Sequence, residues 1–384
     1  MFAVAFDAMG CQMQALAQPV DTTHIQSVPQ ALAALPNDWQ QAEQMFSRFL
    51  PTSELMQLNT ARSMPVSKAF WQMLSHSLAS AKLTDGLITP TVYQALVERG
   101  YDQSYEHSFE QGQSTAASTT LTGESVIGTD AIDDWQKIGL DPTTRQVSLP
   151  DSVKLDFGGF AKGLTADVIA ERLSEMGTNV LIDAGGDIVI RSYQGEISKL
   201  DDATQWQVAL PAVTDIGLPL PNLAAFSESI ALPDWQCATA GVTLSVPVTD
   251  MVLATSGIDY RYWYQGQSLQ HHLINPLRQD VEKATSEVVC ASILIDETLF
   301  YQNQDSFCPT IADFLQTSNA CNLAQTLSKL VCLLGLEKSL QWLDQHGLKG
   351  LGISVIIATP TGYQQWLNPT MQAFCADDNN KDLS

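Results

Sequence analysis

The sequence predicts an α+β, or mixed α/β, fold in which helices flank a largely antiparallel β-sheet. Segments with apolar or alternating strand patterns are spread along the whole chain, stretches with helical periodicity separate them, and glycine pairs mark several turns. The chain has 384 residues, of which 45% are hydrophobic and 16% charged, and this supports a sizeable core in one large or two smaller domains. We find no repeat, heptad run or linker of biased composition.

The N-terminal half is expected to alternate strands with helices. Its helices are predicted where apolar residues recur at three- or four-residue spacing, and a polar stretch rich in Ser, Gln and Thr is typical of an exposed loop. In chain order we expect a strand region at residues 4–16, helices at 39–49, 67–81 and 91–99, a loop or insertion near 102–127, and a strand at 147–156.

The C-terminal half is expected to add further strands, two helices and a closing hairpin. Its apolar or alternating runs predict strands, a proline-containing segment with few periodic patterns predicts a second insertion, and Gly335 separates two helical patterns. In chain order we expect a strand at residues 179–190, the insertion near 198–235, strands at 244–254, 261–264 and 288–295, helices at 319–335 and 337–346, a hairpin at 353–359 and 362–367, and a charged tail at 376–384.

Residues 153–190, VKLDFGGFAKGLTADVIAERLSEMGTNVLIDAGGDIVI, hold the most informative pattern of the chain. A strand that ends at Asp156 is followed by a glycine pair, by Lys162-Gly163 and an amphipathic helix, and then by a second strand and glycine pair. This order can bring backbone amides and a helix N-terminus up to a phosphate, and Lys162 adds a positive charge. The glycines could equally make only the tight turns of an ordinary αβ unit. The segment matches neither the P-loop nor the dinucleotide GxGxxG pattern.

The charge of the chain restricts its partners. Its 19 Lys and Arg residues against 42 Asp and Glu residues give a net charge of −23, which repels nucleic acid and anionic membranes. An anionic ligand would therefore need a local basic pocket. No stretch approaches the ~20 apolar residues of a membrane helix, the N-terminus lacks the pattern of a leader peptide, and the seven scattered cysteines have no metal-binding spacing. We expect a cytoplasmic protein with reduced cysteines.

The glycine pattern at residues 156–187 resembles that of the ApbE family, the FAD:protein FMN transferases, in which DLGGIAKG is followed by a helix and a GGD turn. Four further segments resemble family blocks in the same order. They are Met9-Gly10 for the N-terminal MGT, FSRFLPTSELMQLN at residues 46–59, DGLITPTVYQALVERGY at residues 85–101, and ATSGIDYRYWYQGQSLQHHLINP at residues 254–276. No block is decisive alone, but five in order identify the chain as a member of this family.

The resemblance implies a single ApbE-like domain over residues 1–375 that carries the two insertions. It also implies an enzyme that splits FAD and moves FMN onto a Ser or Thr hydroxyl of an acceptor protein, with AMP as the leaving group. The partners are then FAD and that acceptor protein. The matching positions that would bind FAD are Met9, Phe49, Leu87, Ile88, Thr89, Asp156, Gly158, Gly159, Lys162 and Ile274, and His272 would steer a hydroxyl or a phosphate.

Several of these positions depart from the family pattern. Phe49 keeps the aromatic ring of the tyrosine expected against the flavin but loses its hydroxyl, and Thr89 stands where the family has Asp. Of the two adjacent histidines, His272 holds the family position, so His271 is expected to be the one that faces solvent.

The largest departure concerns the metal ion. In the family, Mg²⁺ bridges the pyrophosphate and is held by a backbone carbonyl of the glycine block and by an Asp and a Thr four residues apart on a late helix. The matching segment here, AQTLSKLVCLLGLEKSL at residues 324–340, has Gln325 and Lys329 at these two positions. We therefore predict no metal-ligating residue, although the resemblance implies a family that uses Mg²⁺.

The pair that replaces the metal ligands carries the same net charge, since Gln plus Lys and Asp plus Mg²⁺ both sum to +1. The Lys329 ammonium, one helical turn after Gln325, could therefore face the phosphates, or it could merely extend to solvent. An ammonium cannot coordinate two oxygens as Mg²⁺ does, so two functions remain open. The first is an active transferase with Lys329 in a catalytic role, and the second is a degenerate homologue that binds FAD or another adenine nucleotide without magnesium chemistry. In both, we expect one wall of the largest pocket to be formed by Asp156, Gly158, Gly159 and Lys162 and the opposite wall by His272 and Lys329.

Overall fold

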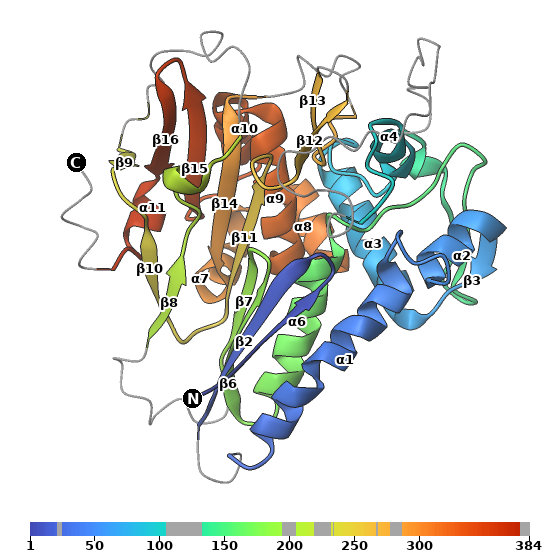
Figure 1. Cartoon of the computed structure of the whole chain (residues 1–384), viewed down its shortest axis with the longest axis horizontal. Coiled ribbons are helices and arrows are strands. Elements are labelled where there is room, and N and C mark those ends of the chain that lie inside the picture. Colours follow the sequence, from blue (N-terminus) through green and yellow to red (C-terminus); the bar gives the residue numbers. More distant parts are fainter. Residues whose placement is uncertain are drawn as a thin grey trace.

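The computed structural model describes residues 1–20, 25–104, 133–193, 205–218, 232, 234–265, 268–276 and 286–376. Most of the two expected insertions, near residues 102–127 and 198–235, and nearly all of the expected tail at 376–384 lie outside the described residues. The described part has an α+β fold in which helices cover one face of a large sheet and a small sheet covers the other (Figure 1).

Nine of the described strands form the large sheet, and every neighbouring pair in it is antiparallel. The prediction of a largely antiparallel sheet is therefore confirmed. From one edge to the other the strands are β1 (Phe2–Ala8), β2 (Cys11–Pro19), β6 (Thr178–Ala184), β7 (Asp187–Arg191), β11 (Met251–Gly257), β14 (Val288–Asp296), β15 (Gly352–Thr359), β16 (Gly362–Leu367) and β9 (Gln236–Ala238). The remaining described strands pair in small sheets: β8 (Gln205–Ala209) with β10 (Thr243–Pro247), β12 (Tyr262–Gln265) with β13 (Ser268–His271), and β5 (Gln146–Ser148) between β3 (Ser63–Pro65) and β4 (Gly139–Asp141).

Three helices lie side by side on one face of the large sheet (Figure 1): α1 (Val28–Phe46), α6 (Ala161–Ser174) and α9 (Ala320–Leu334). The other described helices are α2 (Glu54–Ala61), α3 (Lys68–Leu83), α4 (Tyr93–Glu98), α7 (Glu297–Gln302), α8 (Pro309–Thr317), α10 (Leu336–Gln345) and α11 (Pro369–Gln372). None of the helices in the described ranges combines the length and the apolar character needed to cross a bilayer.

The strands near the middle of the large sheet are buried on both faces, which explains their nearly continuous apolar runs. Leu181, Ile188 and Ile190 belong to a core shared with β8 and β10. Val180, Ile182 and Val189 belong to the core under the helices. A small apolar cavity lies in the first of these cores, where its lining includes Ile188, Val208 and Leu244.

The first helix is longer than predicted. α1 begins at Val28 rather than at residue 39, and it continues through Pro36. A proline inside a helical pattern usually marks a helix end, but here Pro36 lies on the exposed side of the helix. The apolar stripe formed by Leu32, Leu35 and Trp39 passes this point without a break, and all three side chains are buried. Packing therefore keeps the helix intact.

The strand region expected at residues 4–16 is a hairpin of two strands. β1 and β2 are joined by the two-residue turn Met9-Gly10, and both residues have positive φ, 49° and 68°. This geometry matches the twist of a hairpin, but it is costly for a residue with a side chain. The Met9 amide donates to Glu43 Oε1 of α1 at 2.7 Å, so the helix holds the turn in place.

Of the other predicted elements, some form two strands instead of one, one is shorter than predicted, and several are confirmed. The regions at 179–190 and 244–254 each form two strands, β6 with β7 and β10 with β11. The strand predicted at 147–156 is wrong beyond Ser148, because a turn follows in which the Val153 amide donates to the Pro150 carbonyl. The predictions of α3, α9, α10 and the β15–β16 hairpin are confirmed.

Candidate functional site

Asp156 connects the glycine turn to two other parts of the chain. Its side chain is buried, and its Oδ1 accepts from the Gly158 amide at 2.8 Å. Its Oδ2 lies 2.9 Å from Arg48 Nε, just beyond the end of α1. Its own amide donates to the Pro90 carbonyl at 2.8 Å, which ties in the segment between α3 and α4. The carboxylate therefore serves backbone and arginine donors within the protein.

Arg48 lies over two adjacent aromatic rings. Its guanidinium carbon is 4.2 Å from the Phe49 ring centroid and 4.4 Å from that of Tyr101, distances typical of cation–π contacts. The Tyr101 ring in turn lies 5.2 Å from Trp263, and Ile274 is buried in the same cluster. Arg48 Nη2 is buried and has no hydrogen-bond partner among the described residues. The structure thus brings together Phe49 and Ile274, two of the predicted FAD-binding residues.

Two cations converge on Cys11, the residue that follows the Met9–Gly10 turn. Lys162 Nζ, in the first turn of α6, lies 3.3 Å from the Gly185 carbonyl and 3.6 Å from Cys11 Sγ. Arg261 Nη2 donates to the Gly10 carbonyl at 3.1 Å and lies 2.9 Å from Cys11 Sγ. In a chain with a net charge of −23, this is a local basic cluster of the kind an anionic ligand needs.

The histidines at the end of β13 are placed differently from the expectation. His271 is buried, with 6% of its surface exposed, and it pairs with Tyr262 in the β12–β13 ladder, so the expectation that it faces solvent is wrong. His272 is the more exposed member, and its Nδ1 lies 3.3 Å from the Arg261 carbonyl oxygen. Because a carbonyl only accepts, Nδ1 carries the proton and Nε2 is the free acceptor.

Burial and the neighbouring Arg261 hold the pKa of His272 well below its ordinary value. The ring is therefore neutral at physiological pH. A neutral imidazole with a free Nε2 can take a proton from a hydroxyl.

Lys329 of α9 lies on the glycine turn. A Cβ added at Gly159 would be only 3.1 Å from Lys329 Cε, so the two are in contact as the register of the late helix requires. Its ammonium donates to the Gln325 carbonyl at 2.9 Å. Burial lowers the pKa of Lys329 to about 8; the nearby charge of Lys162 acts in the same direction, and the carboxylate of Asp187 opposes it.

Gln325 and Lys329 do not fit a magnesium ion held by side chains. The Gln325 Nε2 donates to Asp187 Oδ2 at 2.9 Å, and its Oε1 is buried without a hydrogen-bond partner among the described residues. Mg²⁺ prefers anionic oxygens in octahedral array, whereas here the Gln325 amide occupies an oxygen of Asp187 and an ammonium lies one helical turn further on. In the described ranges, no group of three or more His, Cys, Asp and Glu side chains could hold a metal.

Three predicted FAD-binding residues lie inside the protein core. Leu87, Ile88 and Thr89 are each at most 5% exposed, and Thr89 Oγ1 lies 2.8 Å from Thr91 Oγ1. They support the site through the neighbouring Pro90, which accepts from the Asp156 amide. The small apolar cavity described above lies on the other side of the sheet and includes none of the predicted site residues in its lining. The pocket expected between Lys162 and His272 therefore stays a prediction.

Sequence reasoning missed Arg48, Tyr101 and Arg261. A usable signal was present, because the chain has only 19 Lys and Arg residues and both arginines fall inside segments that match family blocks. A cation in such a block of an acidic protein is a candidate for pairing or ligand binding.

Comparison with known proteins places this arrangement in a family. A family model described as the ApbE family matches residues 9–297, three quarters of the chain. The chain belongs to the ApbE family. This confirms the assignment that the five sequence blocks indicated.

Curated relatives of this ApbE-family chain are distant. An FAD:protein FMN transferase of Chlamydia muridarum is 23% identical over 206 residues, which are 53% of this chain and 53% of the relative. The chain thus spans about half the length of that relative in the alignment. An FAD:protein FMN transferase of Chlamydia trachomatis serovar D is 21% identical over 77% of this chain and 79% of the relative.

Solved structures share the fold of this ApbE-family chain. The crystal structure of an ApbE protein from Thermotoga maritima has a TM-score of 0.66 at 16% identity and covers 98% of this chain and 99% of its own. The apo form of the Pseudomonas stutzeri flavinyl transferase ApbE has a TM-score of 0.64 at 14% identity, with 97% and 96% covered. At these identities the likeness shows the fold, and it confirms the predicted ApbE-like architecture of a divergent member.

Proposed function

We propose that this ApbE-family protein binds FAD and transfers its FMN half to a Ser or Thr hydroxyl of an acceptor protein, with release of AMP. The observation that carries the proposal is a basic cluster of three cations in a strongly acidic chain: Lys162 and Arg261 meet at Cys11, and Lys329, which lies on Gly159, is close enough to Lys162 for their charges to interact. FAD is a dianion at its pyrophosphate, and the positive charge of this cluster would neutralise it. The family membership and the relatives' names point to the same substrate.

Different residues of the site fit different parts of FAD. Lys162 and Lys329 would neutralise the pyrophosphate. Phe49 and Ile274 would lie against the flavin ring, since both belong to the aromatic cluster around Arg48.

The reaction exchanges one bond to phosphorus for another. The acceptor hydroxyl forms a P–O bond to the FMN phosphorus, the P–O bond to AMP breaks, and AMP leaves with the electron pair. His272 Nε2 takes the hydroxyl proton, because the ring is neutral and its Nδ1 is held by the Arg261 carbonyl. The two lysines neutralise charge on the transferred phosphoryl group and on the leaving AMP.

A second function, nucleotide binding without turnover, is favoured by one observation. The positions of the family's Asp and Thr hold an amide that donates to Asp187 and an ammonium. An ammonium neutralises phosphate charge but cannot coordinate two oxygens at once as a metal can. Binding would therefore tolerate this exchange better than catalysis would.

Product analysis separates the two functions. The purified protein is incubated with FAD, with and without a Ser- or Thr-containing acceptor peptide, in EDTA or in Mg²⁺, and AMP and FMN products are separated. For the transferase we expect AMP release that EDTA does not abolish. FAD binding without AMP release would select the binding function, and absence of FAD binding would contradict both.

The double variant Gln325→Asp with Lys329→Thr should convert the site to metal dependence. It restores an anionic oxygen and a hydroxyl four residues apart, which Mg²⁺ can use. FAD binding or turnover of this variant is expected to require Mg²⁺, in contrast to the wild type, and titration with EDTA measures the difference. If the wild type already requires Mg²⁺, the hypothesis that the Lys329 ammonium takes the place of the metal ion is wrong.

Lys162→Ala is expected to weaken FAD binding by about 1–3 kcal/mol, the usual scale of a charge-assisted hydrogen bond. Quenching of flavin fluorescence during titration measures the affinity. The matched control is Lys82→Ala, which removes an exposed lysine paired with Asp313 on the surface and should leave the affinity unchanged. Equal affinities for all three proteins would mean that Lys162 points away from the phosphates.

A further inference from the structure

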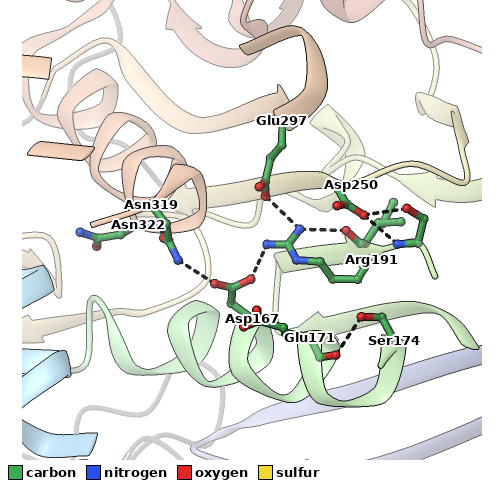
Figure 2. Close-up of polar contacts among 10 residues, drawn as sticks. Asp167, Glu171, Ser174, Arg191, Asp250, Glu297, Asn319 and Asn322 are labelled. Carbon is green, nitrogen blue, oxygen red and sulfur yellow. Dashed lines mark hydrogen bonds and ion pairs between the residues drawn. The ribbon is translucent and has the colours of Figure 1, made fainter. Parts of the chain in front are cut away.

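A polar network lies outside the candidate site and joins four elements (Figure 2). Arg191, at the end of β7, pairs through Nη2 with Asp167 Oδ1 of α6 and through Nη1 with Glu297 Oε1 of α7 at 2.9 Å. Asp167 Oδ2 accepts from Asn319 Nδ2 at 2.7 Å. The side chains of Arg191, Asp167 and Glu297 are at most 16% exposed. A well-shielded cluster of this kind fixes the geometry of its members more strongly than surface pairs do.

Asn319 connects the network to the first turn of α9. It is the N-cap residue of this helix, and its Oδ1 accepts from the Asn322 amide at 3.0 Å. Its Nδ2 is the group that donates to Asp167. One side chain therefore caps α9 and fixes the capped end to α6.

The same two elements meet at two further points toward the candidate site. A Cβ added at Gly163 would lie 2.6 Å from Gln325 Cδ, so only glycine lets α9 approach this closely. Two residues before α6 begins, Gly159 touches Lys329, with 3.1 Å from its added Cβ to Lys329 Cε. The residues numbered 159, 163 and 167 are spaced by four, which places successive contacts along one side of α6.

These contacts fix the register of α9 on α6. Elsewhere α9 is held by Gln325, which donates to Asp187 of β7, and by Asn322 and Thr326, which bond to α3. Toward α6, the glycine contacts allow a close approach but supply no polar group that selects one register. The Asp167–Asn319 contact supplies such a group, since the Asn319 Nδ2 donor and the Asp167 Oδ2 acceptor form a directional hydrogen bond. A slip of one turn would move α9 by ~5.4 Å and take Lys329 off the glycine turn.

We propose that Arg191 is a positioning residue for the candidate phosphate site. It holds Asp167, which holds Asn319, and the register of α9 then places Lys329 on Gly159. The network acts from ~15 Å away, the length of the helix between residues 319 and 329. This positioning role rests on the proposed function in one respect, because its first test measures FAD binding.

The test is a double-mutant cycle that uses a mild variant. Asn319→Ser keeps a side-chain oxygen for the N-cap but removes the donor to Asp167. We expect it to weaken FAD binding about tenfold in the wild-type background and less than about twofold in a Lys329→Ala background, because there the network has no ammonium left to position and the two effects are then not additive. Arg191→Lys, which keeps the charge but loses the fork geometry, should give an intermediate loss.

The matched control is Arg172→Ala on α6, the helix that also carries Asp167. Arg172 pairs with Asp38 and is half exposed, so this variant should leave FAD affinity unchanged in both backgrounds. Equal losses for Asn319→Ser with and without Lys329 would overturn the proposal, because the network would then act only on overall stability.

A ligand-free readout separates this proposal from the proposed function. The pKa of Lys329, followed by NMR of ¹³C-methylated lysines, should rise from about 8 toward its ordinary value in Asn319→Ser, because the ammonium leaves its buried position. An unchanged Lys329 pKa in that variant overturns the positioning role. If the wild type fails to bind FAD, the proposed function falls while this measurement still decides the register.

Discussion

FAD affinity is expected to fall as the pH rises above about 8, because Lys329 then loses its proton in the free protein. Bound pyrophosphate stabilises the ammonium and raises its pKa in the complex, so binding above pH 8 takes up a proton. The dissociation constant should therefore increase by up to about tenfold per pH unit until the pKa of the complex is reached. Below pH 8 the lysine is charged in both states, and its contribution is constant. Titrations of flavin fluorescence across pH 6–10 measure the profile.

Two variants assign this pH dependence to its source. Lys329→Arg keeps a permanent charge and should bind FAD with little change between pH 7 and pH 10. Lys329→Ala should bind more weakly at pH 7 and show the same flat profile. A decline above pH 8 that persists in both variants would assign the titration to another group.

Arg48→Met is expected to lower the free energy of unfolding by about 3–5 kcal/mol, the range for breaking a buried ion pair from one side. The change leaves the Asp156 carboxylate buried without its cation, since both side chains are at most 6% exposed. It also removes the cation–π contacts of the guanidinium with Phe49 and Tyr101. Urea unfolding followed by tryptophan fluorescence measures the loss.

An exposed ion pair provides the comparison for Arg48. Arg172→Met breaks the pair with Asp38, and because that arginine is half exposed the loss should stay below about 1 kcal/mol. The double variant Arg48→Met with Asp156→Asn should recover part of the lost stability, since no unpaired charge remains. If Arg48→Met costs no more than Arg172→Met, the Arg48–Asp156 pair is not shielded as described.

The fold could be predicted where one local signal decides. Gly335 ends α9 with a φ of 83°, a conformation that favours glycine, and the boundary between the last two long helices was found from it. The prediction failed where a local signal conflicts with packing. The first helix was predicted to begin at residue 39, after Pro36, but the apolar stripe around that proline is buried and keeps α1 continuous from Val28. Met9 carried no sign of its left-handed turn, which depends on Glu43 from another element.

The candidate site could be predicted where helical spacing alone places a side chain. Lys329 is on the face of Gln325 because four residues make about one turn, and the structure puts it on the glycine turn. Arg48 could not be found in this way, since its partner Asp156 arrives from a distant part of the chain. The order of His271 and His272 depends on the ladder between β12 and β13, whose register the sequence does not reveal.

The basic cluster of Lys162, Arg261 and Lys329 is built from distant parts of the chain. Its contacts extend from the turn after β1 to the last turns of α9. A growing polypeptide therefore has no complete cluster until α9 has emerged and docked, so the nucleotide cannot guide the early steps of folding. It can act only on the finished fold, which it would stabilise by mass action, by about 2.7 kcal/mol when its concentration is 100 times the dissociation constant. In a cell, the supply of the nucleotide would then influence how long each completed molecule survives proteolysis.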